Sequence, residues 1–198
     1  MVVTLCVAQA SWRSTVAVVD ERARPPAATT GDRFDQLFRA HYGSLYGLTY
    51  RLVGDRQEAE DVVQEAFIAL TRAAVLHRPD DEVLAWLRRV CLNVGHNRVR
   101  TRLRAGRHLE RAGRLAERDT GSPEPLPTVL REEMRSAVRR SLAPLPERHR
   151  ACLLLRHSGH SYAEIAATLE IAVGSVGVLL ARAEKAFRKN YENQESDR

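Results

Sequence analysis

The sequence predicts an all-α fold made of two small helical domains joined by a flexible linker. Apolar residues recur at spacings of three and four along most of the chain, and no stretch alternates as a half-buried strand does. Glycine and proline separate the helical segments clearly at one place, residues 106–127. A length of 198 residues suits two small domains, and a hydrophobic content of 44% is enough for packed cores.

The first helical domain is expected at residues 33–105, after a flexible N-terminal arm at residues 1–32. Its helices are marked by three apolar stripes: Phe34, Leu37, Phe38, Tyr42, Leu45 and Leu48; Ala59, Val63, Ala66, Phe67 and Leu70; Trp86, Leu87, Val90 and Val94. The segment 76–82 contains Pro79 and is expected to be a loop between the second and third helices.

The second domain is expected at residues 128–191, between the linker at 106–127 and a polar tail at 192–198. Ser161 and Glu164 form a capping-box pattern, which predicts the start of a helix. The apolar residues that follow have the spacing of two helices crossing at a short turn; they are Ile165, Ala166, Leu169, Ile171, Val176 and Leu179. This spacing predicts a helix-turn-helix. An ordinary three-helix bundle is the alternative.

Charge is segregated along the first domain. Residues 55–65 contain five acidic residues and one basic residue, whereas residues 88–118 contain ten arginines and two acidic residues. A solvated helix usually mixes its charges. One face of the acidic helix carries Asp61, Gln64, Glu65 and Ile68. An exposed isoleucine among carboxylates suits a protein contact, and a merely solvated surface is the alternative. The net charge of +6 favours an acidic partner such as nucleic acid.

Several classes of protein are not expected. Cys6, Cys91 and Cys152 are far apart, so neither a disulfide framework nor a zinc ribbon is expected, and a cytoplasmic location fits. No apolar run reaches the roughly 18 residues of a membrane span, and residues 1–10 lack the basic start of a signal peptide. The histidines of residues 149–160 lack a clear metal-ligand pattern. We expect no metal, no cofactor, no catalytic residue and hence no enzyme.

Three stretches resemble a known family. GDRQEAEDVVQEAFIAL (54–70) and AWLRRVCLNVGHNRVRTRLR (85–104) resemble the second conserved region of bacterial RNA polymerase sigma factors. LPERHRACLLLRHSGHSYAEIAATL (145–169) resembles the start of their fourth region. With only these two regions and a short tether, the chain is similar to the compact extracytoplasmic-function (ECF) group.

The resemblance implies a sigma factor that binds core polymerase and directs promoter recognition, melting and transcription initiation. The residues implied to bind the clamp of the β′ subunit are Glu60, Asp61, Gln64 and Glu65, next to the exposed Ile68. Those implied to hold the minus-ten element are Arg78, Asp80 and Asp81 in the loop, then Asn93, Asn97, Arg98 and Arg100 on the basic helix. Those expected to contact the minus-thirty-five element are Ser161, Ser175, Arg182 and Lys185.

The implied partners are core RNA polymerase, through its β′ clamp and its β subunit, and promoter DNA. An anti-sigma factor that locks the two domains together is a further expected partner, and free domains are expected to move independently. In this family a base of the non-template strand is flipped into a pocket at the loop. Trp86 is a candidate for stacking on such a base, but its place on an apolar face favours the core.

The recognition helix departs from the family's usual G-T-V-K-S-R-L-x-R-A. Gly177, Val178 and Leu179 stand where lysine, serine and arginine would meet DNA. These side chains offer neither hydrogen bonds to bases nor charge to phosphates. We therefore expect weaker sequence readout by this helix, or an apolar surface that meets a protein. Val178 or Leu179 is a core residue in the alternative that the helix is rotated.

Two other functions compete with the sigma factor. A stand-alone helix-turn-helix regulator would bind duplex DNA as a dimer, but it has no use for an acidic polymerase-binding helix. A protein-interaction adaptor with weakened DNA reading is supported by the apolar recognition helix. Binding to core polymerase separates the first alternative from a sigma factor, and run-off transcription separates the second.

Overall fold

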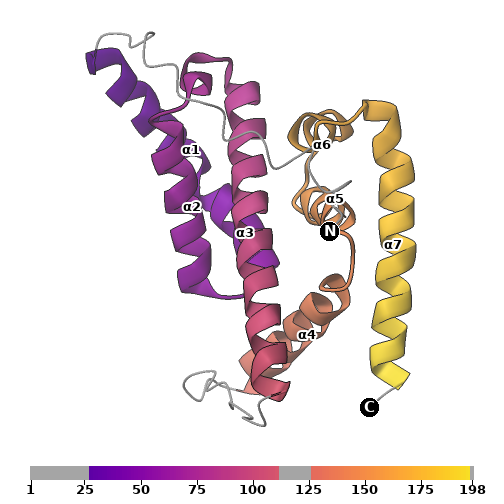
Figure 1. Cartoon of the computed structure of the whole chain (residues 1–198). Coiled ribbons are helices and arrows are strands. Elements are labelled where there is room, and N and C mark those ends of the chain that lie inside the picture. Colours follow the sequence, from indigo (N-terminus) through magenta and orange to yellow (C-terminus); the bar gives the residue numbers. More distant parts are fainter. Residues whose placement is uncertain (1–26, 112–125, 197–198) are drawn as a thin grey trace, which may run out of the picture.

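The computed structural model describes residues 27–111 and 126–196, and all regular structure in these ranges is helical. The elements are α1 (Ala27–Val53), α2 (Arg56–Leu70), the 3-10 helix η1 (Ala74–His77), α3 (Asp80–Arg111), α4 (Leu126–Leu142), α5 (Glu147–His157), α6 (Tyr162–Leu169) and α7 (Val173–Ser196). Helices α1 to α3 form a first unit and α4 to α7 a second (Figure 1). The prediction of an all-α fold is confirmed.

Several helices extend into segments that the sequence assigns to the arm, the linker and the tail. α1 begins at Ala27, α3 continues to Arg111, α4 begins at Leu126 and α7 ends at Ser196. A single glycine such as Gly106 costs a helix only about 1 kcal/mol, so its neighbours carry α3 past it. Pro127 is the second residue of α4, where a missing N–H is tolerated. The rest of the predicted arm and linker lies outside the described residues.

The prediction of a loop at residues 76–82 is wrong in its details. η1 extends to His77, and α3 begins at Asp80, directly after Pro79. Asp80, Asp81 and Glu82 therefore form the first turn of a helix. Carboxylates at this position interact favourably with the unpaired N–H groups of the helix N-terminus, which explains why the acidic run is helical.

The first unit is built around the predicted apolar stripes. Leu45, Val63, Phe67 and Leu87 are each at most 2% exposed. The ring of Phe67 lies 4.9 Å from that of Phe38 in an edge-on contact, which joins α2 to α1. Burial of this set leaves the opposite side of α2 to the solvent, and that is the side with the acidic residues.

A sharp turn joins α1 to α2. Gly54 has a φ of +80°, which a residue without a side chain adopts without strain. Asp55 then caps α2 by accepting a hydrogen bond from the N–H of Glu58 at 2.8 Å. These two residues set the direction in which α2 returns along α1, and with it the position of the acidic face.

The second unit contains the predicted helix-turn-helix. α6 and α7 are bent by 90° at the short turn between them. Arg150 is buried and donates to the carbonyl oxygens of Leu142, Ala143 and Leu145 at 3.1, 2.7 and 3.1 Å. This arginine fixes the turn between α4 and α5, because its guanidinium binds three carbonyl oxygens at and just after the end of α4.

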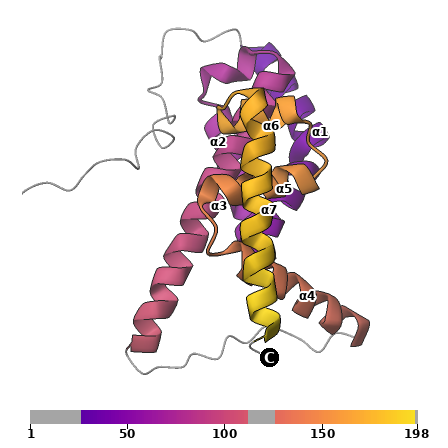
Figure 2. The same ribbon diagram turned by 90° about the vertical axis from the view of Figure 1, so that its right-hand side faces the viewer.

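The two units are in contact. α5 and α6 lie between α3 and α7 (Figure 1), and one apolar cluster joins Leu92 and Val99 of α3 to Leu145 and Ala151 of the second unit. In the turned view, the C-terminal end of α3 and the N-terminal end of α4 point away on opposite sides of α7 (Figure 2). Apolar and polar side chains of α3 thus have partners in the second unit, and the independent movement of the free domains stays a prediction.

Candidate functional site

The predicted polymerase-binding residues lie together on the solvent side of α2. Gln64, Glu65 and Ile68 are exposed, and Glu60 and Asp61 are half-buried beside them. Ile68 is 57% exposed although it is large and apolar. An apolar side chain in such a position is solvated unfavourably unless a partner covers it, so this face has the character of a protein contact.

Arg98 belongs to this acidic face. Its guanidinium contacts Asp61 at 3.4 Å and forms a second ion pair with Glu65. The sequence groups Arg98 with the minus-ten residues, but in the structure its side chain points from α3 toward α2. Arg102, one turn further, likewise pairs with Glu58 of α2 at 3.1 Å. Two arginines of the basic helix therefore hold α2 in place.

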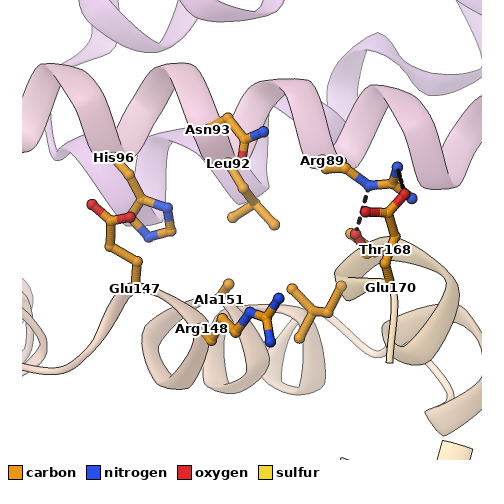
Figure 3. A pocket seen from close by; sticks show the side chains of 10 residues that line it. Arg89, Leu92, Asn93, His96, Glu147, Arg148, Ala151, Thr168 and Glu170 are labelled. Carbon is orange, nitrogen blue, oxygen red and sulfur yellow. Dashed lines mark hydrogen bonds and ion pairs between the residues drawn. The ribbon is translucent and has the colours of Figure 1, made fainter. Parts of the chain in front are cut away.

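The other predicted residues of α3 face the second unit. Asn93 lines a narrow cavity of about 30 Å³ between α3, α5 and α6. Figure 3 shows Arg89, Leu92 and His96 extending from α3 toward these helices, while Asn93 lies at the rim of the cavity close to α3. Arg100 forms a hydrogen bond with Asn97 and an ion pair with Glu147 of α5 at 3.3 Å. Asn97 itself is exposed.

The side of α3 that faces the second unit carries arginines paired with carboxylates and one buried histidine, His96. Burial, together with the positive charges of Arg150 and Arg100, lowers the pKa of His96 to about 3. The imidazole is therefore neutral at physiological pH, and the cations of α3 provide the positive charge.

Among the described residues of α3, Arg89 binds the second unit through both hydrogen bonds and an ion pair, and sequence reasoning missed it. It donates to the carbonyl oxygens of Thr168 at 3.0 Å and Ala167 at 2.9 Å, and it pairs with Glu170. These carbonyls are at the C-terminal end of α6, where a helix carries partial negative charge. The adjacent Arg88 pairs with Glu164 at 3.1 Å. Their partners lie 76 to 81 residues away in the chain, so no local pattern could indicate them.

Glu170 occupies the turn position where helix-turn-helix proteins usually have glycine. Its φ is 52°, a left-handed conformation that is unfavourable for a residue with a side chain by about 1–2 kcal/mol. The carboxylate binds Arg89 of the first unit. The contact between the units thus compensates for the unusual turn residue.

The predicted segment after α2 is anchored by α1. Arg33 donates to the carbonyl oxygens of Leu76 at 3.0 Å and Arg78 at 2.8 Å, and it pairs with Asp80 at 2.6 Å. Arg78 pairs with Glu82 at 3.2 Å. These bonds hold η1 and the first turn of α3 in a defined position.

A larger cavity, of about 500 Å³, lies next to this segment and extends to α6. Asp81, Trp86 and Arg88 contribute to its lining. Trp86 is half-buried and packs against the core of the first unit, as expected from its apolar face, while it also borders the cavity. An aromatic ring and a guanidinium beside an open space are groups that can accommodate a nucleic-acid base.

The predicted minus-thirty-five residues lie along the helix-turn-helix. Ser175, Arg182 and Lys185 are exposed on α7. Val178 is 55% exposed, whereas Leu179 is half-buried and packs on the core. Leu179 therefore lies at the core, as one form of that alternative expects, whereas Val178 does not.

Ser161 has a structural role. Its hydroxyl accepts from the N–H of Glu164 at 3.3 Å, and its own N–H donates to the Glu164 carboxylate at 2.9 Å, which completes the predicted capping box. The hydrogen bond from the Ser161 backbone is the main reason that the pKa of Glu164 falls to about 2. The carboxylate is therefore ionised and able to pair with Arg88.

We expect Ser161→Ala to lower the free energy of unfolding by about 1 kcal/mol, because a helix cap is lost. Chemical denaturation of the full chain measures this. Ser175→Ala, an exposed serine on α7, is the matched control and should change stability by less than about 0.5 kcal/mol. Equal stability of the two variants would show that the capping box does not stabilise α6.

The first unit has an acidic helix with an exposed apolar residue and a cationic helix beside it, and the second unit has a helix-turn-helix. Together these features are typical of one class of protein: transcription factors that contact both another protein and DNA. Comparisons with known families identify that class further. The family model "Sigma-70 region 2" matches residues 37–105, and "Sigma-70, region 4" matches residues 135–187. These matches coincide with the first and second units.

Named relatives of this chain agree with these family matches. RNA polymerase sigma-H factor of Pseudomonas aeruginosa is 35% identical over 170 residues, covering 80% of this chain and 87% of that protein. The ECF sigma factor SigM of Mycobacterium tuberculosis is 34% identical over 164 residues, covering 79% and 77%. The ECF sigma-E factor of Escherichia coli is 36% identical over 141 residues, covering 66% and 72%.

Solved structures have the same fold. The sigma factor RpoE of Bartonella quintana, crystallised with the anti-sigma factor NepR, superposes with a TM-score of 0.55 at 22% identity and covers 80% of this chain and 96% of that one. CnrH, in complex with the cytosolic domain of CnrY, has a TM-score of 0.54 at 21% identity and covers 83% and 95%.

The chain belongs to the sigma-70 family of RNA polymerase sigma factors, in its ECF group. This family is in general not enzymatic. Within residues 27–111 and 126–196, no single helix is both long and apolar enough to cross a membrane; α6 and α7 meet that test of length and composition only when taken together across their bend.

Proposed function

We propose that this chain is a promoter-specificity subunit of RNA polymerase that uses three surfaces. The acidic face of α2 binds the clamp of the β′ subunit, α3 holds the melted minus-ten element, and α6 with α7 contacts the minus-thirty-five element. The observation that carries the proposal is the exposed Ile68 among the carboxylates of α2, beside a cationic α3. A stand-alone DNA-binding regulator would have no function for that face.

The α2 face suits a stable protein contact because it is preorganised. Arg98 holds Asp61 and Glu65 in ion pairs, so these side chains lose little conformational freedom when a partner binds. Ile68 supplies apolar area at the edge of this acidic cluster. Under this proposal Arg98 is a positioning residue for the polymerase contact rather than a direct contact of the promoter strand.

The minus-ten contact is assigned to the opposite side of α3. Asn97 and Arg100 supply an amide and a guanidinium for bases and phosphates, and Asn93 lies one turn earlier on the same side. The first-unit side of the 500 Å³ cavity, beside Trp86, is the candidate place for the flipped base, and α6 covers it in the packed arrangement through Ala163, Glu164 and Ala167. Asp81 lines this pocket, while Arg78 and Asp80 shape the segment beside it.

In the structure this side of α3 is covered in part by the second unit, since Arg100 pairs with Glu147 and Asn93 lines the cavity that α5 and α6 close. Binding of a promoter strand therefore requires that the two units separate. An anti-sigma factor that holds them together is a partner that this arrangement fits. The chain is proposed to act in the cytoplasm, on chromosomal promoters, with no catalytic activity of its own.

Run-off transcription with core polymerase and promoters from the host genome tests the proposed function. The wild-type chain should initiate specific transcripts that core polymerase alone does not make. Absence of transcripts, together with absence of binding to core polymerase, would contradict the proposal.

Asn97→Ala and Arg100→Ala should each reduce open-complex formation several-fold. Loss of one single-strand phosphate contact at Arg100 should also reduce the slope of log affinity against log salt by about 0.7. Permanganate footprinting and salt titration of the holoenzyme measure the two effects. Arg140→Ala, an exposed arginine of α4, is the matched control and should behave as wild type. Normal melting in both α3 variants would assign the minus-ten contact elsewhere.

A further inference from the structure

The outward face of α7 is defined by what the helix buries. Val176, Leu180 and Ala183 are at most 7% exposed and pack into the second unit. The exposed residues of the opposite face are Gly174, Ser175, Val178, Ala181, Arg182 and Lys185. Val178 is the large apolar side chain of this set, and it is 55% exposed. The core of the unit does not explain it.

This face has the properties of a surface for a polyanion. Arg182 and Lys185 follow Val178 on the same side, and Arg188 and Lys189 continue the positive charge along α7. A cationic surface attracts DNA through phosphates, independent of sequence. A Cβ added at Gly174 would meet nothing within 4 Å, so packing does not require glycine there. Small residues beside Val178 allow the helix backbone to approach base edges closely.

Spacing along the helix places Val178 between two polar side chains. Ser175 and Arg182 are seven residues apart, which corresponds to about 10 Å along an α-helix, or the length of about three base pairs. Val178 lies between them, facing the middle pair when the N-terminal half of α7 enters the major groove, as second helices of such motifs do. The apolar group that the major groove offers is the C5-methyl of thymine.

We infer that Val178 is a specificity-determining residue that contacts the methyl group of a thymine in the minus-thirty-five element. The inference rests on the proposed function and refines it, because it names the base that this helix reads. Ser175 and Arg182 border the contact, the first with a hydroxyl and the second with a charge for a neighbouring phosphate or base. A van der Waals contact at Val178 thus replaces the hydrogen bonds that the lysine, serine and arginine usual in this family at positions 177–179 would make.

Replacement of thymine by deoxyuridine tests this contact, because it removes the methyl group and keeps every hydrogen-bonding group. Promoters that the wild-type holoenzyme transcribes are remade with deoxyuridine at each minus-thirty-five thymine in turn, on either strand. At one position, holoenzyme affinity should fall about fourfold, the value for one buried methyl group. In the Val178→Ala holoenzyme, thymine and deoxyuridine at that position should bind within a factor of two.

Val173→Ala is the matched control. Val173 is 53% exposed on α7, but it lies off the face of Ser175 and Arg182, so this variant should keep the fourfold preference for thymine. If wild-type holoenzyme tolerates deoxyuridine at every position, the inference is wrong and Val178 belongs to a protein contact. If wild-type holoenzyme transcribes no promoter, the proposed function itself fails, which is a different result.

Discussion

Ile68→Glu is expected to weaken binding of the chain to core RNA polymerase at least tenfold. Burial of an isoleucine side chain contributes about 1.5–3 kcal/mol, and tenfold in affinity corresponds to about 1.4 kcal/mol. A glutamate at this position loses that contribution and also places a further charge in a desolvated contact. Because Ile68 is 57% exposed, the substitution should leave the fold intact. Titration of labelled chain with core polymerase measures the affinity.

Met134→Glu is the matched control for this experiment. Met134 is 67% exposed on α4, in the second unit, and it receives the same change from apolar to acidic. It should bind core polymerase as wild type does. Charge reversal of Asp61 and Glu65 should also weaken binding, but it removes both partners of Arg98, so Ile68 is the cleaner probe. Wild-type affinity of Ile68→Glu would show that α2 is not the polymerase contact.

The second large effect is expected from Arg89→Ala, which should shift the equilibrium between packed and separated units toward separation at least tenfold. The variant loses two hydrogen bonds to α6 carbonyls and the ion pair with Glu170. A hydrogen bond that involves a charged group contributes about 1.5–3 kcal/mol when it is shielded from water, and the Arg89 side chain is 16% exposed. Small-angle scattering should show a larger radius of gyration, and binding to single-stranded minus-ten DNA should become tighter.

Two further variants distinguish separation of the units from general destabilisation. Glu170→Gly removes the carboxylate partner of Arg89 and relieves the left-handed backbone at φ 52°, so it should open the units without loss of stability. Arg102→Ala removes bonds within the first unit, to Glu58 and to the carbonyl oxygen of Val53. It should lower stability without expansion. An unchanged radius of gyration in Arg89→Ala and Glu170→Gly would contradict the role of this contact.

Local patterns predicted the elements well because helices depend on neighbours in sequence. The stripe through Val63 and Phe67 forms the buried side of α2, and the Ser161–Glu164 pattern caps α6 as expected. Helix ends were predicted less well. Because Asp80 and its acidic neighbours follow a proline, the sequence predicts a loop there. In the structure they form the first turn of α3, where the helix N-terminus stabilises their carboxylates.

At the candidate site, local patterns do not predict which partners neighbouring residues bind. Asn97, Arg98 and Arg100 lie within one turn of α3, and the sequence predicts one common role for them. In the structure Arg98 turns to the carboxylates of α2, whereas Arg100 pairs with Glu147 of α5. Neighbouring positions on a helix point in different directions, so their partners depend on which helix packs on each side.

The sequence alone establishes the helical class, the buried faces, the family motifs and the departure at Gly177–Leu179, since each of these follows from residue types at short spacing. Contacts between distant segments come from the tertiary structure: Arg89 on the end of α6, the compensating turn residue Glu170, and the exposure of Val178 beside a half-buried Leu179. These depend on how helices far apart in the chain pack. Packing places side chains 76 to 81 residues apart within hydrogen-bonding distance, which no local period encodes.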